Sequence, residues 1–176
     1  NQFPKEMRHL YTTSGQSECV DKIIKSILFK DPTSFAKESY FLSFEGHLFG
    51  KGSNFSRSLS QHHFTSEDEL YFPVQHLPHP DDKNYKTILK NLETHLKNSH
   101  LKGIWIEPVR QMDQEGVPLE FLRELKKKAQ EYKIPLIYNE SASQQFHFSE
   151  NHYFISNDED LTPDMTMVFL GGQMGL

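Results

Sequence analysis

The polar residues best suited to chemistry stand where expected strands give way to the next segment. One such stretch, Thr12–Glu18, reads Thr-Thr-Ser-Gly-Gln-Ser-Glu and joins an expected strand to a helix. Glycine allows a tight turn, and the unpaired amides of a helix start can hold a phosphate. The same residues also suit an ordinary helix cap, with Ser14 or Ser17 capping and Glu18 in the first turn. The sequence leaves both interpretations open.

Other polar groups follow the apolar runs that come later in the chain. They are Glu107, Asn139-Glu140 and Gly171-Gly172. Ligands of parallel α/β sheets bind outside the carboxyl ends of the strands. We therefore expect these groups to share one edge of a sheet with the turn at Thr13-Ser14-Gly15.

The histidines do not form a recognisable metal motif. The nearest candidates are His62-His63, the pair His76 and His79, and His147 with Glu150 and His152. None of them matches a known zinc-ligand spacing closely. We therefore predict no metal site.

The elements that must position these groups are short apolar runs that alternate with amphipathic helices. Helices are expected at Ser17–Lys30, Asp81–Asn98 and Val117–Tyr132, the last with Leu119, Leu122, Leu125 and Ala129 on its buried face. Strands are expected at His9–Thr13, Tyr40–Phe44, Glu69–Val74, Gly103–Glu107, Ile134–Tyr138, His152–Ser156 and Met165–Phe169, and Gly46–Thr65 reads mostly as loop. This alternation predicts an α/β fold of three layers, with a mostly parallel sheet between helices.

Composition limits the class of protein. The chain has 176 residues, of which 36% are hydrophobic and 24% charged, which predicts one globular domain over residues 1–176. A net charge of -5 argues against nucleic acid or an anionic membrane as partner, and no apolar run approaches the ~20 residues of a membrane span. The polar first residues and the single cysteine, Cys19, predict a cytoplasmic protein.

A set of ordered motifs runs through almost the whole chain. They are Ser14–Glu18, then Phe44–Gly50 (Phe-Glu-Gly-His-Leu-Phe-Gly), Ile104–Val109 (Ile-Trp-Ile-Glu-Pro-Val), Leu136–Ala142 (Leu-Ile-Tyr-Asn-Glu-Ser-Ala) and Thr162–Met165 (Thr-Pro-Asp-Met). In this order and spacing they resemble the cofactor-binding core of the class III pyridoxal-phosphate-dependent aminotransferases. The resemblance implies an incomplete large domain of the pyridoxal-phosphate-transferase type. In that family a smaller domain completes the enzyme, which usually works as a dimer.

The resemblance also implies where a cofactor would lie. Ser14, Gly15 and Gln16 correspond to the phosphate-binding turn, with Gln16 as an insertion relative to the family pattern. Phe49, or Leu48 in the direct register, stands near the position of the aromatic ring that stacks on the cofactor. The remaining cofactor-binding candidates are Glu107, Asn139 at the ring nitrogen and Gln173 at the position of the lysine.

The groups that perform the chemistry in that family are missing. Asn139 stands where the family has aspartate, and an amide cannot supply the negative charge that keeps the ring nitrogen protonated. Ala142 replaces a glutamine. Counting from the Thr-Pro-Asp motif reaches Leu170, or Gln173 with a short insertion, and the last lysine of the sequence is Lys133. Neither residue can form the imine that a lysine would form.

These departures predict a degenerate, catalytically inactive domain without catalytic residues. We expect a structural, dimerisation or regulatory role, with a second copy or the remainder of a larger polypeptide as partner. The resemblance implies pyridoxal phosphate as the cofactor, whereas the missing groups favour a domain that binds none. The alternative is a segment of a working transaminase that transfers an amino group between an amino donor and a 2-oxo acid.

Overall fold

A computed structural model describes residues 7–30, 38–60, 73–143 and 154–169. Its centre is a five-stranded sheet, in which the strands lie in the order β2-β1-β3-β4-β5 and every neighbouring pair is parallel. The strands are β1 (Tyr40–Phe44), β2 (Val74–Leu77), β3 (Leu101–Ile106), β4 (Leu136–Asn139) and β5 (Met165–Met167). The expected α/β architecture with a mostly parallel sheet is therefore confirmed.

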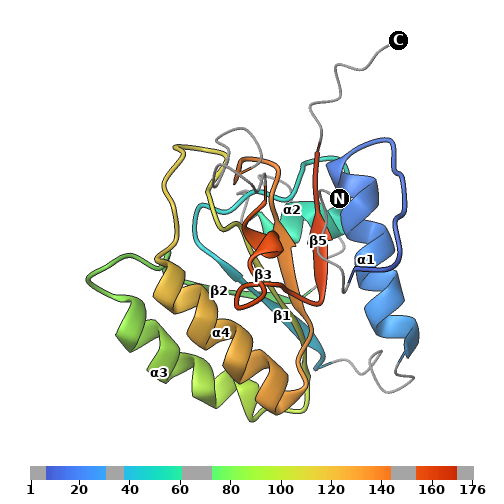
Figure 1. Cartoon of the computed structure of the whole chain (residues 1–176). Coiled ribbons are helices and arrows are strands. Elements are labelled where there is room, and N and C mark those ends of the chain that lie inside the picture. Colours follow the sequence, from blue (N-terminus) through green and yellow to red (C-terminus); the bar gives the residue numbers. More distant parts are fainter. Residues whose placement is uncertain (1–6, 31–37, 61–72, 144–153, 170–176) are drawn as a thin grey trace, which may run out of the picture.

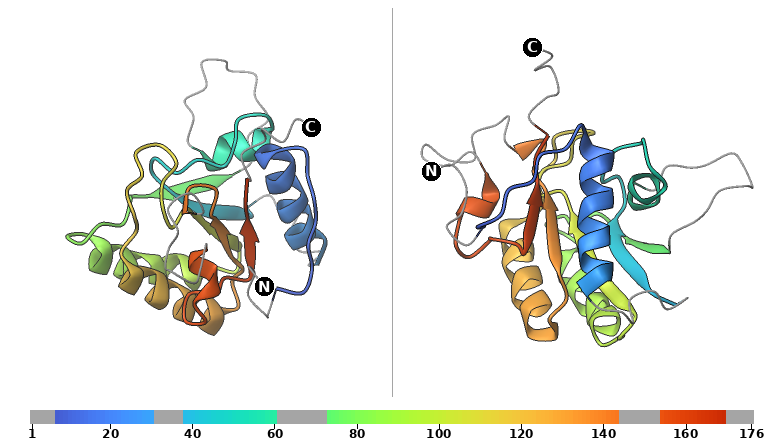
Figure 2. Two further views of the ribbon diagram at one scale, coloured as in Figure 1. Left: turned by 45° about the horizontal axis from the view of Figure 1, so that its top comes forward. Right: turned by 90° about the vertical axis from the view of Figure 1, so that its right-hand side faces the viewer.

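Helices cover both faces of this sheet (Figures 1 and 2). They are α1 (Gln16–Lys30), α2 (Asn54–Leu59), α3 (Tyr85–Leu96) and α4 (Leu119–Tyr132). Helices α3 and α4 pack together on one face, and α1 and α2 pack together on the other. None of the helices in the described part of the chain has the length and apolar character needed to cross a membrane.

Alternating side chains of the strands build a separate core under each helix layer. On β3, Ile104 and Ile106 point toward α3 and α4, whereas Trp105 between them points toward α1. The same alternation holds on β1, where Leu42 and Phe41 lie in opposite cores. This is the two-residue period of a strand that is buried on both faces, which is typical of parallel sheets.

Several local expectations were wrong. Residues 9–13 form no strand, and two of them, Leu10 and Tyr11, are 77% and 78% exposed, so their side chains gain nothing from a sheet face. Ile155–Asn157 is a 3-10 helix rather than part of a strand, and residues 152 and 153 lie outside the described residues. The expected strand Glu69–Val74 also begins outside them, and β2 starts only at Val74.

Two further corrections concern helices. The stretch expected to be loop contains α2, which begins with a capping box because Ser53 and Ser56 each accept a hydrogen bond from the other's backbone amide, at 3.2 and 3.1 Å. On α4, Leu119 is partly exposed and Phe121 takes the expected buried place beside Leu122. The periodicity located the helix and most of its buried face correctly, since Leu122, Leu125 and Ala129 are buried as expected and only Leu119 is not.

Candidate functional site

The carboxyl ends of β3 and β4 bring two polar side chains together. Ile106 pairs with Tyr138, so the residues that follow, Glu107 and Asn139, stand side by side. Both side chains are fully buried, and the Asn139 amide nitrogen lies 3.4 Å from Glu107 Oε1. This is the edge at which the sequence predicted a ligand site.

Glu107 is surrounded by hydrogen-bond donors. Its Oε2 accepts from the Leu48 backbone amide at 2.7 Å, and its Oε1 accepts from the Gln111 side-chain amide at 2.7 Å. Burial nevertheless dominates and raises the pKa of Glu107 to about 7. The carboxyl group thus carries a buried charge above neutral pH, and these donors stabilise that charge.

The backbone of Leu48 lies directly over both side chains. While its amide donates to Glu107, its carbonyl accepts from Asn139 Nδ2 at 2.7 Å and from Gln111 Nε2 at 3.2 Å. The segment Gly46–Gly52, called here the covering loop, therefore occupies the carboxyl edge with its own peptide groups. A ligand at this edge would have to displace it.

The oxygen of the Asn139 amide is also engaged within the chain. It accepts from the Ser141 hydroxyl at 2.6 Å and from the Ser141 backbone amide at 3.2 Å. With Leu48 on its nitrogen and Ser141 on its oxygen, Asn139 acts as an internal link between β4 and the covering loop.

Two glutamines join this network to the start of α1. Gln16 donates to the side-chain oxygen of Gln111 at 2.9 Å, and Gln111 in turn donates to Glu107. The structure thus brings three of the predicted site residues, Gln16, Glu107 and Asn139, into one polar cluster. Gln111 is a residue that sequence reasoning missed, because a lone glutamine after a strand carries no recognisable motif.

The start of α1 is covered from two sides. The Ser14 amide and hydroxyl both donate to Glu18 Oε2 at 2.7 Å, and these bonds hold the pKa of Glu18 down at about 2. The Gly52 amide donates to the Ser17 hydroxyl at 2.7 Å. Gly50, with φ +94°, lies so close that an added Cβ would be 2.6 Å from the Ser17 hydroxyl oxygen.

These contacts bear on both interpretations of the turn. The Ser14 hydroxyl donates to Glu18 rather than accepting from an amide of the helix, so it does not act as the expected cap. Glu18 also places a carboxylate where a phosphate would need positive or neutral surroundings. No atom lies within 4 Å of a Cβ built on Gly15, so that position itself is open.

The side chain of Phe49 points from the covering loop into the core rather than into the site. Its side chain is fully buried, with its ring edge-to-face on Trp105 at a centroid distance of 5.6 Å. Its backbone amide donates to the Ser60 hydroxyl at 2.8 Å. In this structure Phe49 anchors the loop to the core under α1, and its ring offers no exposed surface to a ligand.

His47 is the second residue that sequence reasoning missed. It is fully buried, and its Nδ1 accepts from the Glu107 backbone amide at 2.8 Å. Its Nε2 lies 3.0 Å from Nδ1 of His79. Burial is the main reason that the pKa of His47 lies well below its ordinary value, with His79 adding to the effect. Across the described segments no group of three potential ligands could hold a metal ion.

Glu140 is a structural carboxylate rather than a ligand-binding one. Its two oxygens accept from the Ile155 amide at 2.6 Å, the Ser156 amide and the Ser143 hydroxyl at 3.1 Å, and the Thr166 hydroxyl at 3.2 Å. It thereby holds the 3-10 helix against the ends of β4 and β5. Burial raises its pKa.

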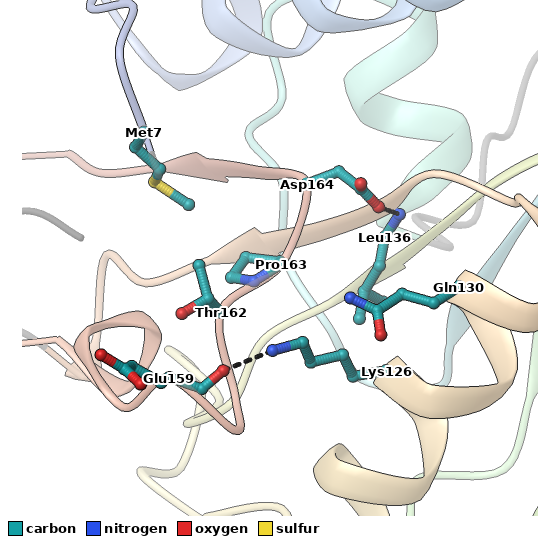
Figure 3. A pocket seen from close by; sticks show the side chains of 8 residues that line it. All are labelled: Met7, Lys126, Gln130, Leu136, Glu159, Thr162, Pro163 and Asp164. Atoms are coloured by element: carbon teal, nitrogen blue, oxygen red, sulfur yellow. Dashed lines mark hydrogen bonds between the residues drawn. The ribbon is translucent and has the colours of Figure 1, made fainter. Parts of the chain in front are cut away.

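Two cavities lie at the opposite, amino-terminal edge of the sheet. One, of about 340 Å3, opens between α4 and the turn before β5, where Lys126 donates to the Glu159 carbonyl (Figure 3). The other, of about 760 Å3, lies between the ends of α1 and α4 and the start of β3. Neither cavity includes a predicted site residue. Gln173, Leu170 and Gly171-Gly172 lie outside the described residues.

Comparisons with known proteins define the fold. No family model matches the chain, and no curated protein matches it. Among solved structures, the chain resembles a transaminase from the marine bacterium Virgibacillus, with a TM-score of 0.74 and 16% identity over 94% of this chain. It also resembles the ornithine aminotransferase of Toxoplasma gondii ME49 (TM-score 0.66, 14% identity, 90% of this chain) and a β-phenylalanine aminotransferase of Variovorax paradoxus (0.65, 16%, 93%).

The chain spans only 38%, 36% and 34% of these three proteins, respectively. At such identities the likeness establishes the fold and nothing finer. The fold is that of part of an aminotransferase-like large domain, as the sequence predicted.

Proposed function

We propose that this chain is a non-catalytic aminotransferase-like domain that serves as a structural module. The observation that carries the proposal is the Leu48 carbonyl, which accepts from Asn139 Nδ2 at 2.7 Å. At the position that resembles the ring-nitrogen partner of the cofactor, this chain places its own backbone. The side chain that would recognise a ligand is already part of the internal packing.

The residues present do not fit pyridoxal phosphate. Asn139 carries no charge, is fully buried and has partners on both atoms of its amide. The Ser14 amide and hydroxyl are taken by the carboxylate of Glu18, which would repel a phosphate. The Phe49 ring is enclosed in the core. Binding the cofactor would require several of these contacts to break at once.

The alternative is that the chain is a segment of a working transaminase. It is favoured by the fold, since the similar solved structures are transaminases and one of them, from Toxoplasma gondii, is described with pyridoxal phosphate at its active site. Within the covering loop the lysine is Lys51, between Gly50 and Gly52. It is exposed, and we take it as the residue to test for imine formation.

The experiment is a titration of the full chain with pyridoxal phosphate, followed by the imine absorbance band, the melting temperature and borohydride reduction. We expect no saturable band and no rise in melting temperature. Slow, non-saturating labelling of several surface lysines fits this expectation. One modified site at a 1:1 ratio, lost in Lys51→Met but retained in the matched surface variant Lys83→Met, would contradict the proposal and favour the alternative.

The structural role is supported by two adjacent apolar side chains that the fold leaves exposed. Leu10 and Tyr11 lie before α1 and are 77% and 78% exposed. A contact with a second copy or with the remainder of a longer polypeptide would bury them. If the second copy is the partner, Leu10→Glu combined with Tyr11→Glu should weaken self-association in sedimentation equilibrium. Lys83→Glu, at an exposed position, changes the net charge by the same -2 and serves as the charge-change control.

A further inference from the structure

The hydrogen bonds of His47 allow only one protonation state. Because its Nδ1 accepts from the Glu107 backbone amide at 2.8 Å, that nitrogen carries no proton. The single proton of the neutral ring must then be on Nε2, from which it is donated to Nδ1 of His79 at 3.0 Å. His79 Nδ1 is therefore an acceptor as well. The closed structure requires both rings to be neutral.

His47 is also placed to control the covering loop. It lies between Gly46, with φ +76°, and Leu48, whose amide and carbonyl lie on Glu107 and Asn139. Phe49, the next residue, is held independently by the core and by Ser60. If His47 leaves its position, the peptide that joins it to Leu48 moves with it and withdraws the Leu48 amide from Glu107. The Leu48 carbonyl belongs to the next planar peptide, which it shares with the Phe49 amide, so it can stay on Asn139 while Phe49 stays in place.

We propose that the His47–His79 pair makes Gly46–Leu48 an acid-released cover over the buried carboxyl group of Glu107. This inference goes beyond the proposed structural role and holds whether or not the domain binds a ligand. It concerns how access to the carboxyl edge of the sheet is controlled.

The physical reason is a conflict between donors. A proton added to His47 Nδ1 would face the Glu107 amide hydrogen, and one added to His79 Nδ1 would face the hydrogen of His47 Nε2. Burial disfavours the charge as well and lowers the pKa of both rings. Once released into water, each ring regains an ordinary pKa of about 6.5. The closed form is therefore stabilised above that pH and is weakened as the pH falls below it.

Other charges around the pair modify this response. Those facing it are Arg110, which is held by Asp113 and Glu115, and His76, Asp81 and Glu107. Arg110 and His76 oppose a positive charge at the pair, whereas Asp81 and the acidic partners of Arg110 favour it. Glu107 acts in the opposite direction to the histidines, because its raised pKa favours the closed, protonated form as the pH falls from 7 toward 4.5.

The two effects differ in size. If neither ring is protonated in the closed form, each ring raises the equilibrium constant for opening by up to tenfold for every pH unit below 6.5. At pH 5 the two rings together raise it by roughly 1,000-fold. Protonation of Glu107 lowers the same equilibrium constant by roughly 80-fold at pH 5, and this effect stops growing below about pH 4.5. The histidine pair therefore prevails, with a net opening of up to roughly tenfold at pH 5 and more below it.

The test is hydrogen exchange of the Leu48 amide by NMR in the full chain at pH 7.5 and 5, corrected for intrinsic exchange. The Phe49 amide is the internal reference. His47→Asn is the matched variant, because its side-chain oxygen can accept from the Glu107 amide but cannot be protonated. We expect wild-type Leu48 to lose protection on acidification by up to roughly tenfold. In His47→Asn the protection should stay level or rise, because the roughly 80-fold effect of Glu107 at pH 5 then exceeds the roughly 30-fold effect of His79 alone.

Equal responses in wild type and variant would overturn the proposal, and so would parallel loss of protection at Phe49, which would mean that the whole region opens. Nitrogen chemical shifts of His47 provide a check that needs no variant. The neutral ring with its proton on Nε2 is expected at pH 7.5. A proton on Nδ1 at that pH would contradict the hydrogen-bond arrangement on which the proposal rests.

Discussion

Replacing Asn139 by aspartate restores the residue found in the family that the sequence resembles, and it separates the two accounts of this site. In this structure the Asn139 amide nitrogen donates to the Leu48 carbonyl at 2.7 Å and lies 3.4 Å from Glu107 Oε1. Aspartate would put an acceptor against both of these acceptors. It would also place a second carboxylate beside Glu107 in a fully buried position.

The expected loss of stability follows from these contacts. Losing the buried donor costs about 1–3 kcal/mol, and the second buried negative charge raises the total to the order of 3 kcal/mol at pH 8. At pH 5 the new carboxyl group can be protonated and donate to the Leu48 carbonyl. The cost should then fall to about 1 kcal/mol or less.

Urea unfolding of wild type and Asn139→Asp at pH 8 and pH 5 measures both numbers. Asn98→Asp is the matched control. Asn98 is exposed, and its side-chain oxygen accepts from the His100 amide, a role that aspartate retains. The control should change stability by less than about 0.5 kcal/mol. A variant Asn139→Asp that is as stable as wild type at pH 8, and that gains stability with pyridoxal phosphate, would refute this reasoning.

Three further variants probe the same edge. Glu107→Gln should cost about 2 kcal/mol at pH 8, since its amide would meet the donors Leu48 or Gln111. Because Glu107 offsets part of the acid destabilisation by the histidine pair, the variant should also lose stability more steeply than wild type as the pH falls from about 7 to 4.5, which unfolding curves across that range measure. Gly50→Ala should cost about 1–3 kcal/mol in thermal unfolding, because φ is +94° and the new Cβ would meet Ser17. The control Gly15→Ala should cost less than about 1 kcal/mol, because a Cβ at that position meets open space. Equal losses of stability in the two variants would contradict the close approach of the covering loop to α1. Glu140→Gln should cost about 2 kcal/mol in urea unfolding, because the amide nitrogen of the new glutamine would face the Ile155 or Ser156 amide. An unchanged midpoint of urea unfolding would show that this carboxylate does not hold the 3-10 helix.

The architecture could be predicted because its signal is carried by periodic burial. The strand at Tyr40–Phe44 and the helix ending at Lys30 have the predicted boundaries to within one residue. The apolar residues of the helix face the core once in every turn, and alternate residues of the strand face the same core. The segment 9–13 misled because it is locally apolar and rich in β-branched residues. Strand formation needs a neighbour, and local composition contains no information about one.

The site was predictable only in part. The position of Glu107 and Asn139 at one sheet edge follows from strand ends in a parallel sheet. Their partners did not follow, because Leu48 contributes backbone atoms and Gln111 a lone side chain, and neither leaves a pattern in the sequence. His47 pairs with a residue 32 positions away, which is a tertiary contact that no local spacing encodes.

The most direct test of the account is an NMR titration with pyridoxal phosphate that follows the Leu48 backbone amide and the Asn139 side-chain amide together. If the covering loop fills the carboxyl edge, both signals stay in place and protected from exchange at millimolar cofactor. Saturable shifts of both signals, with loss of protection at Leu48, would mean that the cofactor displaces the loop and that the edge is a ligand site after all.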